Sequence, residues 1–189
     1  MLLVVSGPDR VGKSTLIREI HDTLGAENCV VYHHSAPDPR ESDVFATYRK
    51  EIGQTAEGKH VIFDRGWPCT FVLEQLRKRN SGHFDQLIEL EMWVNEVMED
   101  GVMHIAQLRP WNWSAPLHIE ELKEEDPLAT NWVLRDRYVE RMQEHKQYTE
   151  QLMDFLEDIT MFPNVTLTET VPGRDVLDMC SNSLLKSGQ

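Results

Sequence analysis

The sequence has few cysteines, no long apolar run and little positive charge. Its three cysteines, Cys29, Cys69 and Cys180, lack metal-ligand spacing, and an odd number is a poor disulfide framework. Buried thiols in a reducing compartment are therefore expected, which favours a cytoplasmic location. No apolar stretch approaches the ~18 residues that a membrane-spanning helix requires, so no membrane partner is expected.

The charge balance limits which partners the chain can bind. Against 32 acidic residues stand 19 lysines and arginines, so the formal net charge is −13. This disfavours DNA as a partner, because a nucleic-acid groove needs an extended basic surface, although a small basic site within an acidic shell is compatible with it. The length of 189 residues suits one domain, 1–189, and no repeat or linker divides it. A homodimer is left open.

Short apolar runs alternate along the chain with longer segments whose apolar residues recur at helical spacing. Asp126-Pro127 is typical of a helix N-cap followed by proline at the first helical position. The predicted strands are residues 2–6, 29–33, 60–64, 102–108 and 165–169. The predicted helices are residues 13–24, 84–98, 126 to about 155, and 174–185.

Strands that alternate with helices predict a three-layer α/β fold with a mostly parallel five-stranded sheet. Ligands in such folds bind at the carboxyl ends of the strands, so functional residues are expected just after each strand. The least regular segment is 109–126, which contains two prolines, two tryptophans and an acidic cluster. We predict a flap there, within the single domain.

The strongest motif lies between the first predicted strand and the first predicted helix. It reads Gly7-Pro8-Asp9-Arg10-Val11-Gly12-Lys13-Ser14-Thr15 and matches G-x-x-x-x-G-K-[ST], the phosphate-binding loop of nucleotide-binding proteins. Glycines let backbone N–H groups converge on phosphate oxygens, and the following helix presents its positive end. Lys13 would neutralise the β- and γ-phosphates, and the Ser14 hydroxyl would ligate Mg²⁺. The predicted ATP-binding residues of the loop are Gly7, Gly12, Lys13, Ser14 and Thr15.

A second motif, Asp64-Arg65, ends the third predicted strand. Asp64 stands where a carboxylate can hold the Mg²⁺ shell, and Arg65 would project into the same cleft. A guanidinium forms a two-point pair with phosphate, so Arg65 is a candidate to bind the phosphate of an acceptor. A surface Asp-Arg pair in a turn is the simpler alternative.

These two motifs resemble those of thymidylate kinases and related P-loop nucleotide kinases, in the subtype with an arginine inside the loop. The resemblance implies that Arg10 stabilises the transferring phosphate and that Asp9 meets the acceptor nucleotide near its sugar. It also implies that Arg65 holds the acceptor phosphate and that Arg174 lies near the adenine. The chain departs from the family at Gly66, where an aromatic residue or histidine is usual.

Other candidates follow from position alone. Arg109 ends the fourth predicted strand and could reach the ATP phosphates. Trp67 and Phe71 follow Arg65 and could stack on an acceptor base, or pack beneath a helix. His33 and His34 end the second predicted strand, as acceptor contacts or as ordinary polar residues at the rim of the sheet.

Together these features predict an enzyme: an ATP- and Mg²⁺-dependent nucleoside monophosphate kinase acting on a deoxynucleotide such as dTMP or a relative. Lys13, Arg10 and Arg65 would be catalytic, Asp9, Asp64, Arg65, Trp67 and Phe71 would bind the acceptor, and Ser14 and Asp64 would hold the metal. Alternatives are a small-metabolite kinase and a kinase for a hydroxyl of a deoxynucleoside or of a hydroxymethylated base in DNA, with Asp64 or Asp9 as base. A nucleotide-binding switch ATPase without a small acceptor is an alternative of another class.

Overall fold

A computed structural model of the protein describes residues 1–7, 11–34, 43–70, 84–98, 103–108, 131–158 and 165–170. Its centre is a five-stranded sheet in the order β2-β3-β1-β4-β5, in which every pairing is parallel. The parallel sheet predicted from the sequence is therefore confirmed. The strands are β1 (Leu2–Ser6), β2 (Cys29–His33), β3 (His60–Asp64), β4 (Met103–Leu108) and β5 (Val165–Thr170).

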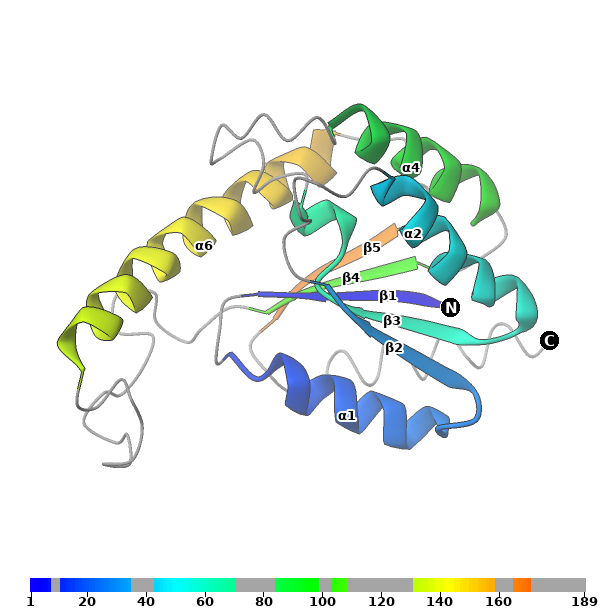
Figure 1. Cartoon of the computed structure of the whole chain (residues 1–189), viewed down its shortest axis with the longest axis horizontal. Coiled ribbons are helices and arrows are strands. Elements are labelled where there is room, and N and C mark those ends of the chain that lie inside the picture. The colour runs from blue at the N-terminus through cyan, green and yellow to red at the C-terminus, as the bar shows by residue number, and fades with distance from the viewer. Residues whose placement is uncertain are drawn as a thin grey trace.

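Helices cover both faces of the sheet and complete the three layers (Figure 1). Helix α1 (Lys13–Leu24) lies on one face, and α2 (Val44–Ile52) and α4 (Phe84–Val97) lie on the other. The long helix α6 (Trp132–Asp158) starts beyond the end of the sheet and rises toward the side of α2 and α4 (Figure 1). A short 3-10 helix, η1 (Gly53–Glu57), connects α2 to β3. No helix in the described ranges is both long and apolar enough to cross a membrane.

The central strand β1 explains why the sheet needs both layers. All five of its residues are buried. Leu2 and Val4 belong to the core beneath α2 and α4, whereas Leu3 and Val5 belong to the core beneath α1. Successive side chains point to opposite faces, so an unbroken apolar run is buried only when both faces are covered. Each such side chain contributes roughly 1.5–3 kcal/mol of hydrophobic stabilisation.

The ends of the helices follow from local chemistry. Helix α1 begins after Gly12, which is in the left-handed conformation, and ends before Gly25. The Asp43 carboxylate caps α2 by accepting a hydrogen bond from the Ala46 N–H at 2.7 Å. The prediction did not include α2, although Val44, Tyr48 and Ile52 form its buried face at a spacing of four residues.

The predicted start of the long helix at residue 126 is wrong. Asn131 is not helical, and its side-chain oxygen accepts hydrogen bonds from the N–H groups of Val133 and Leu134. These bonds satisfy donors of the first turn, so the helix begins at Trp132. Asp126-Pro127, the predicted flap at 109–126 and the predicted helix at 174–185 lie outside the described residues.

Candidate functional site at the carboxyl edge of the sheet

Gly7 follows β1 and starts the loop that leads into α1. Its φ is 139°, and a Cβ atom placed there would lie 2.5 Å from the carbonyl oxygen of Leu108 at the end of β4. Any side chain would therefore collide with backbone, so the first glycine of the motif is required by packing as well as by conformation. The predicted residues Asp9 and Arg10 lie outside the described residues.

Lys13 lies at the far end of this loop, in the first turn of α1. Its side chain is buried, with 8% of the residue exposed, and its Nζ donates a hydrogen bond to the Gly7 carbonyl oxygen at 3.1 Å. The cation is thus held at the loop itself. Ser14 and Thr15 are exposed in the same turn. An ammonium group at a helix N-terminus, with hydroxyls beside it, is an arrangement suited to phosphate.

The Asp64-Arg65 corner lies beside this loop because β3 is the direct neighbour of β1. Asp64 is in register with Val5 of β1 and His33 of β2. The Arg65 N–H donates to the Val5 carbonyl oxygen at 2.9 Å, and the Asp64 carbonyl oxygen accepts from the His34 N–H at 3.1 Å. The corner is therefore fixed to both neighbouring strands at the edge where the phosphate loop begins.

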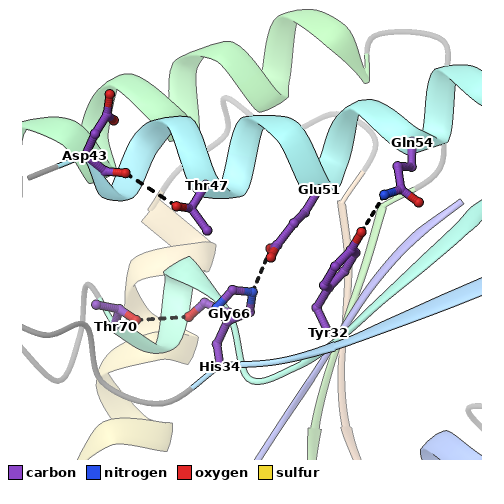
Figure 2. Close-up of polar contacts among 8 residues, drawn as sticks. All are labelled: Tyr32, His34, Asp43, Thr47, Glu51, Gln54, Gly66 and Thr70. Atoms are coloured by element: carbon purple, nitrogen blue, oxygen red, sulfur yellow. Dashed lines mark hydrogen bonds and ion pairs between the residues drawn. The ribbon is translucent and has the colours of Figure 1, made fainter. Parts of the chain in front are cut away.

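Arg65 itself adopts an unfavourable backbone conformation. Its φ is 64°, and it is the only non-glycine residue with positive φ among those the structure describes. A side chain in this region costs about 1–3 kcal/mol, and such strain collects where a side chain must be aimed for function. After the corner, the Gly66 carbonyl oxygen accepts from the Thr70 N–H at 3.1 Å and from its hydroxyl at 3.4 Å (Figure 2), which starts a new helical turn.

The two oxygens of the Asp64 carboxylate have different surroundings. Oδ2 lies 2.8 Å from Nδ1 of His33, whose ring is 71% exposed. Oδ1 is buried and has no hydrogen-bond partner within the described part of the chain. A buried carboxylate oxygen without a donor costs about 1–3 kcal/mol or more, and a bound cation or its water would remove that cost.

This carboxylate and the Ser14 hydroxyl fit Mg²⁺, which prefers oxygen ligands. Across the described residues no cluster of at least three His, Cys, Asp or Glu side chains could enclose a metal ion. Mg²⁺ is commonly held by one or two protein oxygens together with water and substrate phosphates, so a sparse protein contribution suits it.

His34 is tied to α2 rather than directed at the sheet edge. Its Nε2 lies 2.8 Å from Oε2 of Glu51 (Figure 2), and its ring lies 4.5 Å from the Tyr48 ring and 5.2 Å from the Phe63 ring, centroid to centroid. With this pairing and stacking, His34 joins β2 to α2. His33 is therefore the better placed of the two histidines for contact with a ligand.

The structure does not fit the predicted stacking of Trp67 on an acceptor base. Trp67 is fully buried, and its ring packs edge-on against Tyr48 and Phe63. Its Nε1 donates a hydrogen bond to Oε2 of Glu91 at 2.6 Å. The helical turn after Arg65 directs Trp67 into the core, so the packing alternative applies. Phe71, Arg109 and Arg174 lie outside the described residues.

A buried polar cluster behind the loop was not foreseen from the sequence. The Ser6 hydroxyl lies 2.9 Å from the Tyr148 hydroxyl of α6 and accepts from the Cys69 thiol at 3.0 Å. Burial raises the pKa of Tyr148 well above its usual value, so the phenol stays protonated. The one available signal was Ser6, a polar residue at the end of an apolar strand.

Comparisons with known proteins show the fold. A solved structure of a putative polyphosphate kinase 2 from Pseudomonas aeruginosa PA01 matches 98% of this chain, with a TM-score of 0.66 and 17% identity. Polyphosphate kinase 2 from Arthrobacter aurescens TC1 matches 88%, with a TM-score of 0.57 and 15% identity. The match to the thymidylate kinase from Ehrlichia chaffeensis covers 98% of both chains at 13% identity, with a TM-score of 0.43.

The chain therefore has the three-layer P-loop kinase fold that its sequence predicts. It spans 41% of the Pseudomonas chain and 60% of the Arthrobacter chain. No family model and no curated protein matches the sequence.

Proposed function

We propose that the protein is a phosphotransferase that moves the γ-phosphoryl group of ATP to a nucleoside monophosphate, dTMP or a relative. One observation supports this most: the Lys13 loop and the Arg65 corner open at the same edge of the sheet, joined by the hydrogen bond from the Arg65 N–H to the Val5 carbonyl. A donor site and a second anion site are thereby adjacent, as transfer between two phosphates requires.

In this proposal the loop binds the donor and the corner binds the acceptor. Lys13 neutralises the donor phosphates, and Arg65 pairs with the acceptor phosphate through two parallel hydrogen bonds. Mg²⁺, held by Ser14 and Asp64, would neutralise charge on the donor phosphates. The acceptor oxygen is already anionic, so positioning and charge stabilisation suffice without a strong base.

The remaining predicted residues keep their roles as part of the proposal. Arg10 would stabilise the transferring phosphate, Asp9 would meet the acceptor sugar, and Phe71 would contact the acceptor. Arg109 would reach the ATP phosphates, and Arg174 would lie near the adenine. Trp67 is left out because its ring is fully buried.

The contact between His33 and Asp64 favours a second candidate, a kinase for a hydroxyl group. A carboxylate that holds one imidazole nitrogen leaves the other nitrogen of an exposed ring for proton transfer. This pair could accept the proton of a deoxynucleoside hydroxyl or of a hydroxymethylated base in DNA. An acceptor panel separates the two candidates, because only a hydroxyl acceptor requires such a base.

The first experiment measures transfer by the wild-type chain to nucleosides, nucleoside monophosphates and hydroxymethylated DNA. ATP is the principal donor, and inorganic polyphosphate is a second one because two structural neighbours are named polyphosphate kinases. A monophosphate should be the preferred acceptor. ATP consumption without any acceptor would instead indicate a switch ATPase, and preference for a nucleoside or DNA would establish the hydroxyl kinase.

Arg65 variants test the acceptor site directly. Arg65→Ala should lower kcat/KM for the acceptor by about a hundredfold or more and leave ATP affinity within about threefold, since a charge-assisted two-point contact is lost. Arg65→Lys should be nearly as harmful because lysine cannot copy the planar pair.

Arg49→Lys is the matched control for the arginine series. The guanidinium of this exposed residue of α2 lies over the rings of Phe45 and Trp93. Its kinetics should equal those of the wild type. A harmless Arg65→Lys substitution, or one that weakened only ATP binding, would contradict the acceptor role.

A further inference from the structure

The buried hydroxyl of Tyr148 connects α6 to both halves of the proposed site. We infer that Tyr148 is a positioning residue for phosphoryl transfer, which fixes the end of β1 and the corner after β3 relative to each other through Ser6 and Cys69. This inference rests on the proposed function, because a fixed distance between the two regions matters only if phosphate passes between them.

The connection to the donor side is short. Tyr148 is 1% exposed and Ser6 is 2% exposed, and their hydroxyls are 2.9 Å apart. Ser6 directly precedes Gly7, whose carbonyl oxygen accepts the hydrogen bond from Lys13. Ser6, which bonds Tyr148, is therefore one peptide unit away from Gly7, which bonds the Lys13 ammonium group.

The connection to the acceptor side passes through Cys69. Its thiol donates to the same Ser6 hydroxyl, and it lies in the helical turn that directly follows the corner. The Arg65 guanidinium also acts on Tyr148, since its charge opposes the rise in the pKa of the phenol that burial causes. Tyr148 is thus within electrostatic reach of the acceptor arginine and in hydrogen-bond contact with the donor strand.

The polarity of this cluster is not explained by packing alone. A phenylalanine ring would fill almost the same space without bringing a hydroxyl into the core, where a polar group is costly unless it is hydrogen-bonded. The hydroxyl instead holds three elements in a fixed arrangement: β1, the turn at residues 67–70 and α6. Reacting atoms must approach to about 3–3.5 Å, and a shift of about 1 Å costs on the order of a hundredfold in rate.

The test removes the hydroxyl and keeps the ring. Tyr148→Phe should lower kcat by about tenfold to a hundredfold, while the Kd for ATP, measured without acceptor, changes less than about threefold. Ser6→Ala should have a similar effect, and the double variant should lose little more than either single one, because both hydroxyls belong to one hydrogen-bonded cluster with Cys69.

Tyr32→Phe is the control, since it removes a hydroxyl that bonds Gln54 of η1 (Figure 2) and does not contact Ser6. Its kcat should be unchanged, and the melting temperatures of the two tyrosine variants should be similar. If the wild type is active and Tyr148→Phe keeps its kcat, or loses no more than Tyr32→Phe, the inference is overturned and the proposed function stands. A wild type that transfers phosphate to no acceptor overturns both.

Discussion

At the scale of single residues, a side chain at Gly7 would be destabilising for two reasons, its positive φ and the close approach of Leu108. Substitutions at three glycines can measure the two effects separately. Gly7 has a positive φ, and its Cβ position lies 2.5 Å from Leu108. Gly58 has a φ of 80° but no atom within 4 Å of its Cβ position. Gly53 has a negative φ and likewise no atom within 4 Å. Gly58→Ala should cost about 1–2 kcal/mol through backbone strain alone. Gly7→Ala should cost several kcal/mol and weaken ATP binding, because β4 must move.

Denaturant unfolding of the three alanine variants measures this order. Gly53→Ala should match or slightly exceed the wild type, since alanine reduces the freedom of the unfolded chain. If Gly7→Ala were no less stable than Gly58→Ala, the contact with Leu108 would not constrain the loop.

The prediction for Lys13 follows most directly from the sequence, because this lysine belongs to the G-x-x-x-x-G-K-[ST] motif. Lys13→Ala should lower kcat by at least a hundredfold to a thousandfold, the usual scale for removing one electrostatic stabiliser. It should leave the melting temperature within a few degrees, because the substitution also removes a charge from a site that is only 8% exposed. Lys50→Ala, on the exposed side of α2, is the control and should be fully active.

The sequence could place Gly7 directly after β1 and Lys13 at the start of α1, because the motif is a run of consecutive residues between a strand and a helix. The direction of Trp67 was not predictable, because it depends on how the helical turn after Arg65 meets the core. The Tyr148 cluster was out of reach for a related reason. Its three members come from β1, the turn at 67–70 and α6, and no short motif joins them.

At the scale of elements, one hydrogen bond joins α4 to the turn that follows the acceptor corner. Burial raises the pKa of Glu91 from 4.5 to about 7, while the bond from Trp67 opposes that rise. The folded chain therefore binds this proton more tightly than the unfolded chain. Stability should fall as the pH rises from about 4.5 to about 7, and the loss should be complete above that range.

Glu91→Gln should remove this dependence. Glutamine still accepts the hydrogen bond from Trp67 but does not ionise, so the variant should gain up to about 3 kcal/mol relative to the wild type at pH 8 and little at pH 4. Urea unfolding at both pH values measures the difference. Glu89→Gln, an exposed neighbour on α4, should keep the wild-type profile. Parallel profiles for all three proteins would contradict the role of Glu91.

The elements themselves were predicted unevenly, for physical reasons. All five strands were found to within a residue at each end, because each is a compact run of mainly apolar or β-branched residues. Helix α2 was missed because nine residues with three buried positions give a weak periodic signal. The start of α6 was misplaced because the sequence offers more than one capping residue, and the oxygen of Asn131 makes the bonds at the first turn of α6.

At the scale of the whole molecule, the two proposed substrate regions lie at one edge because β1 sits between β3 and β4. Alternation of strands and helices predicts a parallel sheet but does not fix the order of its strands. That Gly7 and Arg65 lie close together could be expected only because ligands in such folds bind at the carboxyl ends of the strands. The strand order of the structure adds the specific contacts, between Arg65 and Val5 and between Gly7 and Leu108.

The central place of β1 also affects how the chain comes to be folded. Leu2 pairs with Val61 and with Met103, so the first strand to leave the ribosome finds its partners only after much of the chain has been made. Until then the unpaired apolar run of β1, Leu2 to Val5, is exposed, and closing such long loops is slow. Gly7 cannot pack against the Leu108 carbonyl before β4 has been made and has paired with β1. The loop that begins at Gly7 therefore reaches its final packing late in the synthesis of the chain.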